Sequence, residues 1–518
     1  MRLSKYILQL ILLALLGAGQ VFSQIKPSNL QFVRQGVKRL IFADDQSISL
    51  AELRPQDVIG MKTMYPAKVL GGAPKISVVD DILRLESQEP SEASIWFGGF
   101  NPFATYFIQF DSLNVHGELG FEFSDPISSE YFRVTIVADG CQLQDVFLYV
   151  KRPSGDLLKR SILTHLPTDS IPSGRIILQM LGSGLNVFIQ DKGLPKSFGQ
   201  ADFAEEMDLR LLEYMQQFQS RVYAKIDRGS VHIEHVESAL TTGIGQADIR
   251  AITYKNGSPF LDQDRIWYTM SIRGRALPHH LQGVFSMNPS VFDIRLEGII
   301  VFDRGDGMLR NEISSHIFYD QENEIWRGLT TGFSAYAKQG EEKQILAIES
   351  QKDPRFGFSI MKARATGIVG DIEDSHIIYD TLAQKWRLLT CENLGGYKAV
   401  IMESDIWDRG YSRIAGPVAE NSTGTSMQMI DGQRFCFAGS SAREIFIYSY
   451  PDLQKLGKLN MDLPPWDPTS RTRVWPNVVS LPKGFPFRFA ALMMDRYNFP
   501  GQVGPHWSYG ALHLYHGY

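Results

Sequence analysis

The chain has 518 residues, a formal net charge of −5 and 44% hydrophobic residues. This length is too great for one ordinary domain, so we expect two domains with large cores. The near-neutral charge, without a basic tract, gives no reason to expect a nucleic-acid partner. The three cysteines lack the spacing of metal ligands, and we expect buried thiols, with a disulfide between the last two as the alternative. They are Cys141, Cys391 and Cys436.

Residues 1–23 have the pattern of a secretory signal peptide. Arg2 and Lys5 precede an apolar stretch over residues 6–16, and small residues follow near Ser23. The apolar stretch is too short for a comfortable membrane span, and no later segment approaches about 20 uninterrupted apolar residues. We therefore expect export to the periplasm or the extracellular medium, with no membrane span in the mature chain.

Short alternating runs recur between residues 24 and 240. Closely spaced strands with Gly, Pro and Asp turns favour an antiparallel β-sandwich. The runs cover residues 106–110, 117–123, 132–137, 146–150 and 175–180, with further hairpin strands over 184–191 and 221–236. Apolar residues at helical spacing over 203–223 predict an amphipathic helix or helical loop. In layout the segment resembles the concanavalin A-like sandwiches that accompany carbohydrate-active enzymes, either as a buttress or as a glycan-binding module.

A tract in the second half of the chain is written twice. The pattern of residues 315–330 returns over 375–390, so that His316 matches His376 and Trp326 matches Trp386 at an offset of 60 residues. Self-similarity at about this period is the signature of a β-propeller, in which each repeat forms one blade. Each copy reads as two strands joined by a short polar turn, which is a hairpin.

Weaker copies of the hairpin lie on both sides of this pair. They join 248–252 to 266–269, 426–429 to 434–437, and 474–479 to 487–492. Five blades over residues 241–518 fall inside the usual range of about four to eight. The sequence therefore predicts an all-β chain with an N-terminal sandwich over 24–240 and a five-bladed propeller over 241–518.

Three carboxylates stand at the starts of successive inner strands. The innermost strands of a propeller line its central channel, so residues at their starts converge. Asp248, Glu312 and Glu373 occupy these places in the first three blades. A carboxylate before a strand is commonly a turn residue. A functional role is favoured here because three successive blades each have a carboxylate at the same place.

The strand starts resemble those of five-bladed glycoside hydrolases of the family 43 kind. Residues 372–376 (Ile-Glu-Asp-Ser-His) are similar to the Ile-Glu-Gly-Pro-His start that carries the general acid, and 246–250 (Gln-Ala-Asp-Ile-Arg) to the Arg-Asp-Pro start that carries the base. Residues 265–275 look closer to exported pectin-degrading propellers, including those of families 137 and 143. The resemblance implies Glu373 as acid, Asp248 as base and Glu312 in a tuning role.

This assignment agrees with the chemistry of glycoside cleavage. One carboxyl group must be protonated to assist the leaving oxygen, and a second must be ionised to activate water or attack the anomeric carbon. Arginine forks bind carboxylates and aromatic rings stack on sugars, so an acidic sugar is a plausible ligand. The expected substrate-binding residues are Arg250, His316, His376, Asp374, Arg473 and Trp475. His316 and His376 are equally well explained as packing between blades.

We expect no required metal and no cofactor, since an Asp-x-Asp-x-Asp loop is absent from the sequence. The predicted protein is a monomeric, exported, exo-acting glycoside hydrolase on plant pectin-type polysaccharide. A propeller polysaccharide lyase, which needs a His or Tyr base and a neutraliser of the uronate carboxylate, remains an alternative. A non-catalytic glycan-binding propeller is the third interpretation.

Overall fold

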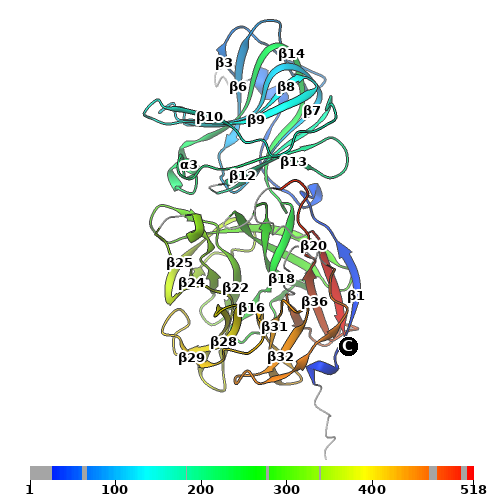
Figure 1. Cartoon of the computed structure of the whole chain (residues 1–518), viewed down its shortest axis with the longest axis vertical. Helices are drawn as coiled ribbons and strands as arrows, with labels where there is room; N and C mark the ends of the chain where they lie inside the picture. The colour runs from blue at the N-terminus through cyan, green and yellow to red at the C-terminus, as the bar shows by residue number, and fades with distance from the viewer. Residues whose placement is uncertain are drawn as a thin grey trace, which may run out of the picture.

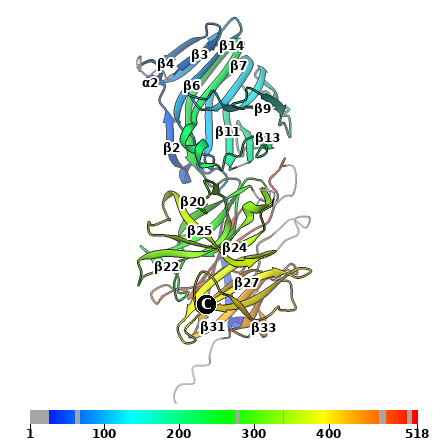
Figure 2. The same cartoon turned by 90° about the vertical axis from the view of Figure 1, so that its left-hand side faces the viewer.

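The computed structural model describes residues 26–60, 67–182, 184–275, 279–337, 340–465, 475–502 and 510–518. The expected signal peptide lies outside these residues. The chain forms two bodies stacked along the long axis of the molecule, an upper one from the first half of the chain and a lower one mainly from the second half (Figures 1 and 2). Among the described residues, none of the helices has the length and hydropathy needed to cross a membrane.

The upper body is built from antiparallel strands. Its main sheet has the order β10-β9-β8-β7-β11-β12-β13, and β14 pairs with β2, β5, β6 and β7. Its elements are β2 (Ile48–Leu53), α2 (Pro55–Gly60), β3 (Ala67–Gly71), β4 (Lys75–Val79), β5 (Ile82–Ser87), β6 (Ser91–Gly99), β7 (Thr105–Ser124), β8 (Tyr131–Gly140), β9 (Gln142–Lys151), β10 (Leu157–Ser161), β11 (Gly174–Leu181), β12 (Gly184–Gln190), β13 (Lys196–Asp202), α3 (Leu212–Gln217) and β14 (Gln219–Leu240).

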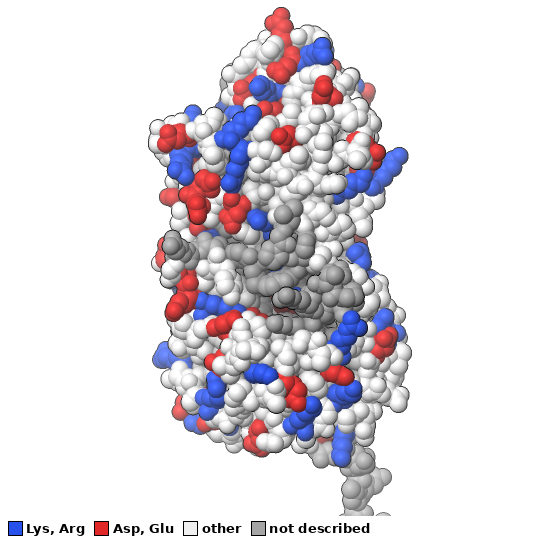
Figure 3. Space-filling view, in the orientation of Figure 1, with Lys and Arg blue, Asp and Glu red and all other residues white. Residues whose placement is uncertain are grey.

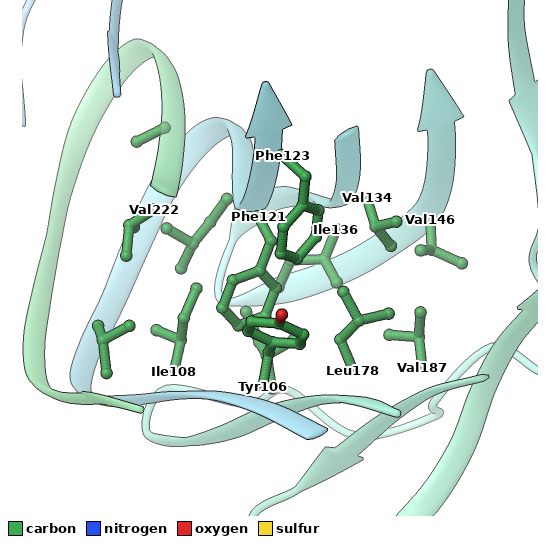
Figure 4. Packing of buried hydrophobic residues seen from close by; sticks show 14 of the residues in the cluster. Tyr106, Ile108, Phe121, Phe123, Val134, Ile136, Val146, Leu178, Val187 and Val222 are labelled. Carbon is green, nitrogen blue, oxygen red and sulfur yellow. The ribbon is translucent and has the colours of Figure 1, made fainter. Parts of the chain in front are cut away.

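The core of the upper body follows from period-2 patterning. Along β8, Phe132, Val134 and Ile136 are buried, and the residues between them face the other side of the sheet. Phe121 and Phe123 of β7 pack with them around Tyr106 (Figure 4). The sheets therefore close over a core that is rich in aromatic residues.

Two expectations for this body are wrong in detail. Residues 106–110 and 117–123 lie in one bent strand, β7, which pairs with β14 along almost its whole length. Of the helix or helical loop expected over 203–223, only the short helix α3 forms, because the chain from Gln219 onward pairs with both β6 and β7. Strand pairing of the backbone has overridden the helical spacing of the apolar residues.

The lower body contains five successive meanders in the described part of the chain, antiparallel except where β34 pairs with β1 in parallel. The first is β15-β18-β19-β20, the second β22-β23-β24-β25, the third β26-β27-β28-β29, the fourth β30-β31-β32-β33, and the fifth β35-β36-β37 with β1 and β34. Their first strands contact one another in order, from β15 to β22, β26, β30 and β35, and β15 also contacts β36. The fifth meander thus lies next to the first, and the five meanders form a closed ring.

The strands of the lower body have the following bounds: β1 (Gln31–Lys38), β15 (Gly245–Ala251), β16 (Thr253–Tyr254), β17 (Leu261–Asp262), β18 (Arg265–Arg273), β19 (His280–Asn288), β20 (Asp293–Asp303), β21 (Leu309–Arg310), β22 (Ile313–Asp320), β23 (Ile325–Thr331), β24 (Gln344–Ser350), β25 (Gly357–Val369), β26 (Ile372–Asp380), β27 (Lys385–Asn393), β28 (Tyr397–Ser404), β29 (Ser412–Ala415), β30 (Thr423–Ile430), β31 (Gln433–Gly439), β32 (Ile445–Ser449), β33 (Lys455–Lys458), β34 (Asn460–Met461), β35 (Val478–Ser480), β36 (Phe489–Met494) and β37 (Leu512–Gly517). The short 3-10 helices are η1 (Pro27–Asn29), η2 (Asp44–Gln46) and η3 (Phe333–Ala337).

The hairpins expected from the repeat are confirmed. Tyr319 of β22 pairs with Trp326 of β23, and the pairing returns 60 residues later as Tyr379 with Trp386. The rings of each pair are in contact, with centroids 4.8 Å apart in the first and 5.2 Å in the second. The two tryptophans therefore pack at equivalent places in successive meanders.

The first strand of the chain lies in the fifth meander. β1 pairs antiparallel with β37, with Phe32 opposite Gly517 and Val33 opposite His516. The predicted sandwich segment, 24–240, includes these residues, whereas their hydrogen bonds join the N-terminal and C-terminal parts of the chain. Figure 1 shows β1, in blue, beside the red C-terminal strands.

The two bodies are joined by apolar and polar contacts. Phe103 of the upper body packs on Phe358 of the lower body, with ring centroids 6.0 Å apart. Asp202, at the end of β13, lies 2.7 Å from Nε2 of His279. The upper body is therefore fixed against the first and second meanders, close to the start of β15.

Candidate functional site

The first strands of four successive meanders begin with the same backbone irregularity. Each has a register shift near its start, and a residue in the left-handed region lies within it. These residues are Asp248 (φ 52°), Ser314 (φ 59°), Asp374 (φ 65°) and Gly424 (φ 60°). A left-handed conformation is uncommon outside glycine, and bulges of this kind redirect side chains. The four positions are therefore structurally equivalent.

Asp374 links three of these positions. Its Oδ1 accepts a hydrogen bond from Ser314 Oγ at 2.8 Å, and its Oδ2 accepts one from the Gly424 N–H at 2.7 Å. Cys391 Sγ lies 3.5 Å from the same Oδ2. The carboxylate is buried and both oxygens are bonded. Asp374, predicted to bind substrate, thus joins the second, third and fourth meanders.

Asp248 has a different environment. Ser271 Oγ donates to its Oδ2 at 2.5 Å, and Arg273 donates to the same oxygen at 2.7 Å. No hydrogen bond from a described residue reaches Oδ1. Ser271 and Arg273 thus hold one oxygen of the carboxylate, while the second oxygen remains available to a substrate or a water molecule.

Arg250 lies two residues beyond Asp248 and is almost fully buried. Its guanidinium donates to the backbone carbonyls of Asp374, at 2.8 Å, and of Thr425. Burial lowers its pKa, against the opposing effect of Asp374. Arg250 was expected to bind the substrate, but its described bonds connect the first meander to the third and fourth.

Trp475 packs over the same centre. Its Nε1 donates to the Ile249 carbonyl at 2.8 Å, and its ring lies 5.3 Å from the Arg250 guanidinium. A Cβ added to Gly424 would lie 2.7 Å from this ring. The indole therefore closes the packing around Arg250. Arg473, predicted beside it, lies outside the described residues.

His316 and His376 are stacked between the second and third meanders, with ring centroids 4.0 Å apart. His316 accepts from the Ile377 N–H at Nδ1 and contacts Thr253 Oγ1 through Nε2. Burial, followed by the Arg250 charge, lowers the pKa of His316 to about 3, and burial also lowers the pKa of His376. Both side chains are buried. This burial agrees with packing between successive repeats, the alternative to substrate binding.

Glu312 is completely buried in an ion pair. Arg304 and Ser334 Oγ donate to its Oε1 at 2.8 and 2.6 Å, and the Ser334 N–H donates to Oε2 at 2.8 Å. These contacts fix the segment around η3. Both oxygens are bonded and solvent does not reach them, so the role of Glu312 in this structure is to stabilise the fold.

Glu373 lies beside a lysine. Lys343 Nζ is 2.8 Å from Glu373 Oε2 and 2.7 Å from Asp371 Oδ1. Burial alone would lower the pKa of Lys343, but the two carboxylates outweigh it and the pKa is raised. Burial raises the pKa of the adjacent Tyr397, and Glu373 and Asp371 raise it further. Glu373 is thus partly accessible and held in an ion pair.

The carboxylates of Glu373 and Asp374 and the thiol of Cys391 lie within 4.8 Å of one another. Burial, followed by the two carboxylates, raises the pKa of this thiol well above its usual value. The thiolate is the form of cysteine that binds a metal, so these three groups would hold a metal ion only with loss of the thiol proton. The three cysteines of the chain are free thiols.

A cavity of about 540 Å³ lies elsewhere, between the two bodies. Arg39, His165, Lys196 and Tyr497 are among its lining residues, and its described lining contains no acid. Acid–base cleavage of a glycoside needs carboxyl groups, so the described lining of this cavity does not make it the candidate site for that reaction. Figure 3 shows acidic and basic side chains interspersed over one face of the molecule, so local groups decide which ligand binds.

Several residues of the site were not expected. Ser271 and Arg273 hold Asp248, Ser314 joins Asp374, and Lys343 pairs with Glu373. One signal was available in the repeat, because counting back two residues from each histidine gives Ser314 and Asp374. The lysine comes from the segment before β24, and no pattern in the sequence points to it.

The chain matches no protein-family model, and no curated protein matches it. Among solved structures it is similar to a family 43 glycoside hydrolase from Xanthomonas citri in complex with xylose, with 10% identity, a TM-score of 0.37, and coverage of 53% of this chain and 88% of that one. A thermostable family 43 glycoside hydrolase matches with 11% identity, a TM-score of 0.36 and the same coverage. A family 117 glycoside hydrolase from Zobellia galactanivorans matches with 9% identity, a TM-score of 0.35, and coverage of 53% and 84%. At identities and scores this low, the likeness assigns no activity to this chain.

Proposed function

We propose that the protein is an exported, exo-acting glycoside hydrolase that removes a terminal sugar from a plant pectin-type polysaccharide. In this proposal the upper body is an accessory β-sandwich, and the five meanders are the blades of a propeller closed by β1. The observation that carries the activity is Asp248, a buried carboxylate with one oxygen held by Ser271 and Arg273 and the other without a described partner. The similarity of residues 265–275 to exported pectin-degrading propellers supports the substrate class.

The reaction needs a base and an acid. As the base, Asp248 accepts a proton from a water molecule whose oxygen attacks the anomeric carbon. As a nucleophile, Asp248 instead attacks that carbon itself. The acid gives its proton to the leaving oxygen as the glycosidic bond breaks. Glu373 is the candidate acid because it is the accessible carboxyl next to the bulge of the third meander. Lys343 holds Glu373 at 2.8 Å, and Glu373 acts as the acid once this ion pair opens and the carboxyl group carries the proton.

The structure bears on the rival activities. A lyase would need a neutral base that reaches the substrate, but His316 and His376 are both buried between meanders and His316 is hydrogen-bonded there. These two histidines are therefore poor candidates for the base of a lyase. The available oxygen of Asp248 could also accept a hydrogen bond from a sugar hydroxyl in a non-catalytic binding protein, so turnover is what separates that alternative from the hydrolase.

The test is a screen of pectic oligosaccharides with the products identified. Asp248→Asn should lower product release about 10²–10⁴-fold, which is the usual contribution of an acid–base group. The matched control is Asp452→Asn at an exposed position of the lower body, which should retain full activity. Thermal unfolding of both variants establishes that each is folded.

Other results would reject the proposal. Full activity of a folded Asp248→Asn variant would exclude the mechanism. Products that absorb in the near ultraviolet would identify a lyase. Binding of an oligosaccharide without turnover, unchanged in Asp248→Asn, would identify a glycan-binding protein.

A further inference from the structure

The cavity of about 540 Å³ between the two bodies is formed by both of them. The upper body supplies one wall, with His165 and residues 194–197, and the lower body supplies the other, with Arg39 and residues 497–501. The volume is within the usual range for small-ligand sites, which occur preferentially where two domains meet. We call this space the junction cavity.

Packing around the junction cavity holds its walls in place. Phe499 and Ile244 are buried in a cluster that joins the two bodies, and the Phe499 ring lies 5.6 Å from the ring of Phe188 on β12. The Gln502 side chain donates to Ser197 Oγ at 3.1 Å, which ties the lower wall to the upper one. A ligand would therefore meet a preformed surface, and a preformed surface lowers the cost of ordering on binding.

Apolar side chains make up much of the lining. Leu194 is 56% exposed and Tyr497 is 37% exposed, although both are large. The other apolar residues of the lining are Ile41, Pro195, Ile244, Phe499 and Pro500. Exposed apolar side chains gathered in a concave site are typical of ligand-binding grooves. The cavity thus offers an apolar surface on two sides to a small molecule.

The charged groups in the described lining are basic. Arg39 and Lys196 lie on the lower and upper walls, and both are exposed. In the described structure Arg39 forms no ion pair, and Lys196 approaches Asp169 at 4.0 Å. The Arg39 guanidinium lies against Gly510, because a Cβ added to this glycine would be 3.0 Å from Nη1. An accessible guanidinium without a counter-charge therefore stands at the edge of an apolar surface.

This combination selects for two properties in one ligand. A carboxylate accepts two hydrogen bonds from a guanidinium fork. A flat ring covers apolar surface and packs well against other rings, such as that of Phe499. A neutral ligand would leave the basic groups without a counter-charge, and a small anion without a ring would leave the apolar lining in contact with water.

We propose that the junction cavity binds a small aromatic carboxylate. Its ring lies on the apolar lining, its carboxylate accepts hydrogen bonds from Arg39, and Lys196 adds positive charge from the opposite wall. The inference goes beyond the proposed hydrolase and does not depend on it, because the lining residues are separate from those around Asp248.

Calorimetric titration with three probes separates the two contributions. Cinnamate, ionised at neutral pH, carries both the ring and the charge; cinnamamide keeps the ring without the charge, and acetate keeps the charge without the ring. Cinnamate should bind the mature protein at millimolar concentration or below, and each of the other two should bind at least about tenfold more weakly. Added salt should weaken the binding of cinnamate, because it screens exposed charges.

Variants assign the contributions to residues. Arg39→Ala should weaken cinnamate binding about threefold to tenfold and leave cinnamamide binding unchanged, since the lost contact is charged but exposed. Leu194→Ala should weaken the binding of both probes, because it removes apolar contact area. Both side chains are exposed, so neither change should unfold the protein, and thermal unfolding checks this.

The matched control is Lys38→Ala, which removes the same charge one residue away. The Lys38 ammonium lies over the Phe292 ring, 5.6 Å from its centroid, and this variant should bind cinnamate as the wild type does. Equal binding of cinnamate and cinnamamide, or of cinnamate and acetate, would overturn the inference. So would unchanged cinnamate binding in Arg39→Ala, an equal loss in Lys38→Ala, or no binding at millimolar concentration. Asp248→Asn should bind cinnamate normally, so failure of the hydrolase proposal would not affect this result.

Discussion

Ser314 Oγ donates to Asp374 Oδ1 at 2.8 Å, and the two residues are 60 positions apart in the chain. This separation is the offset of the sequence repeat, so a residue in one meander bonds directly to its own counterpart in the next. Both have a left-handed backbone, and the Gly424 N–H completes the set from the fourth meander. Hydrogen bonds between equivalent bulges of the second, third and fourth meanders therefore form a network at the centre of the lower body.

This network predicts a stability effect. Ser314→Ala leaves a buried carboxylate oxygen without its donor and should lower the free energy of unfolding by about 1–3 kcal/mol. Asp374→Ala should cost more, because it also removes the acceptor for Gly424 and leaves alanine in a left-handed conformation. Urea unfolding measures both. Ser290→Ala, at an exposed turn of the first meander, is the control and should change stability by less than about 0.5 kcal/mol. Equal midpoints for all three variants would contradict the structural role.

The strand content and the hairpins of the repeat were predictable because period-2 patterning and turn residues act locally. Tyr319 with Trp326 and Tyr379 with Trp386 pair as expected. The place of β1 was not predictable, since its partner β37 lies at the other end of the sequence. Local patterning carries no information about which edge a strand will join.

The site was predictable only in part. The sequence pattern predicts that Glu373 is the counterpart of Asp248, whereas the bulges align Asp374 with Asp248. A bulge inserts one residue and turns the following side chains, so a shift of one position exchanges a channel residue for its neighbour. The partners that decide the role of each carboxylate, Arg273, Arg304 and Lys343, come from other strands and loops.

Glu373 and Glu312 should respond differently to replacement by glutamine, which removes the charge. Glu373→Gln should abolish turnover of the natural glycan and leave the fold intact, while a substrate with an activated leaving group is still cleaved, since it needs little protonation. Glu312→Gln should instead destabilise the protein by about 1–3 kcal/mol, because it replaces one of the two buried acceptor oxygens that bind Arg304 and Ser334 with an amide donor. Kinetics on both substrates and thermal unfolding separate the outcomes. Near-normal activity of Glu373→Gln on the natural glycan would remove it from the role of acid.

Stability should fall between pH 7 and pH 5. Burial is the first cause that lowers the pKa of His279, His280, His316, His376 and His516, so these side chains stay neutral in the folded protein while the unfolded chain takes up protons below about pH 6.5. The unfolded state then binds more protons, and the free energy of unfolding decreases as the pH falls. His235 opposes this trend, because a hydrogen bond to Glu237 raises its pKa.

The contribution of His316 can be measured separately. With a folded pKa of about 3 and an unfolded value of about 6.5, it accounts for roughly 2 kcal/mol of the loss between pH 7 and pH 5. His316→Gln should reduce the pH dependence by this amount, and the exposed His165→Gln should leave it unchanged. Urea unfolding at the two pH values provides the comparison. A slope that is the same in His316→Gln and wild type would show that His316 takes up its proton in the folded state.

The contact of β1 with the C-terminal strands gives the last prediction. Phe32 is 6% exposed and packs with Phe489 and Tyr515, whereas Val33, the next residue on the same strand, is 51% exposed. Phe32→Ala should therefore cost about 3–5 kcal/mol, and Val33→Ala should be close to neutral. Gly517→Ala should also destabilise, since its Cβ would lie 2.8 Å from the Phe32 ring and 2.9 Å from the Cβ of Phe489. Denaturant unfolding of the three variants tests this, and equal stabilities of Phe32→Ala and Val33→Ala would show that β1 is not needed to close the fifth meander.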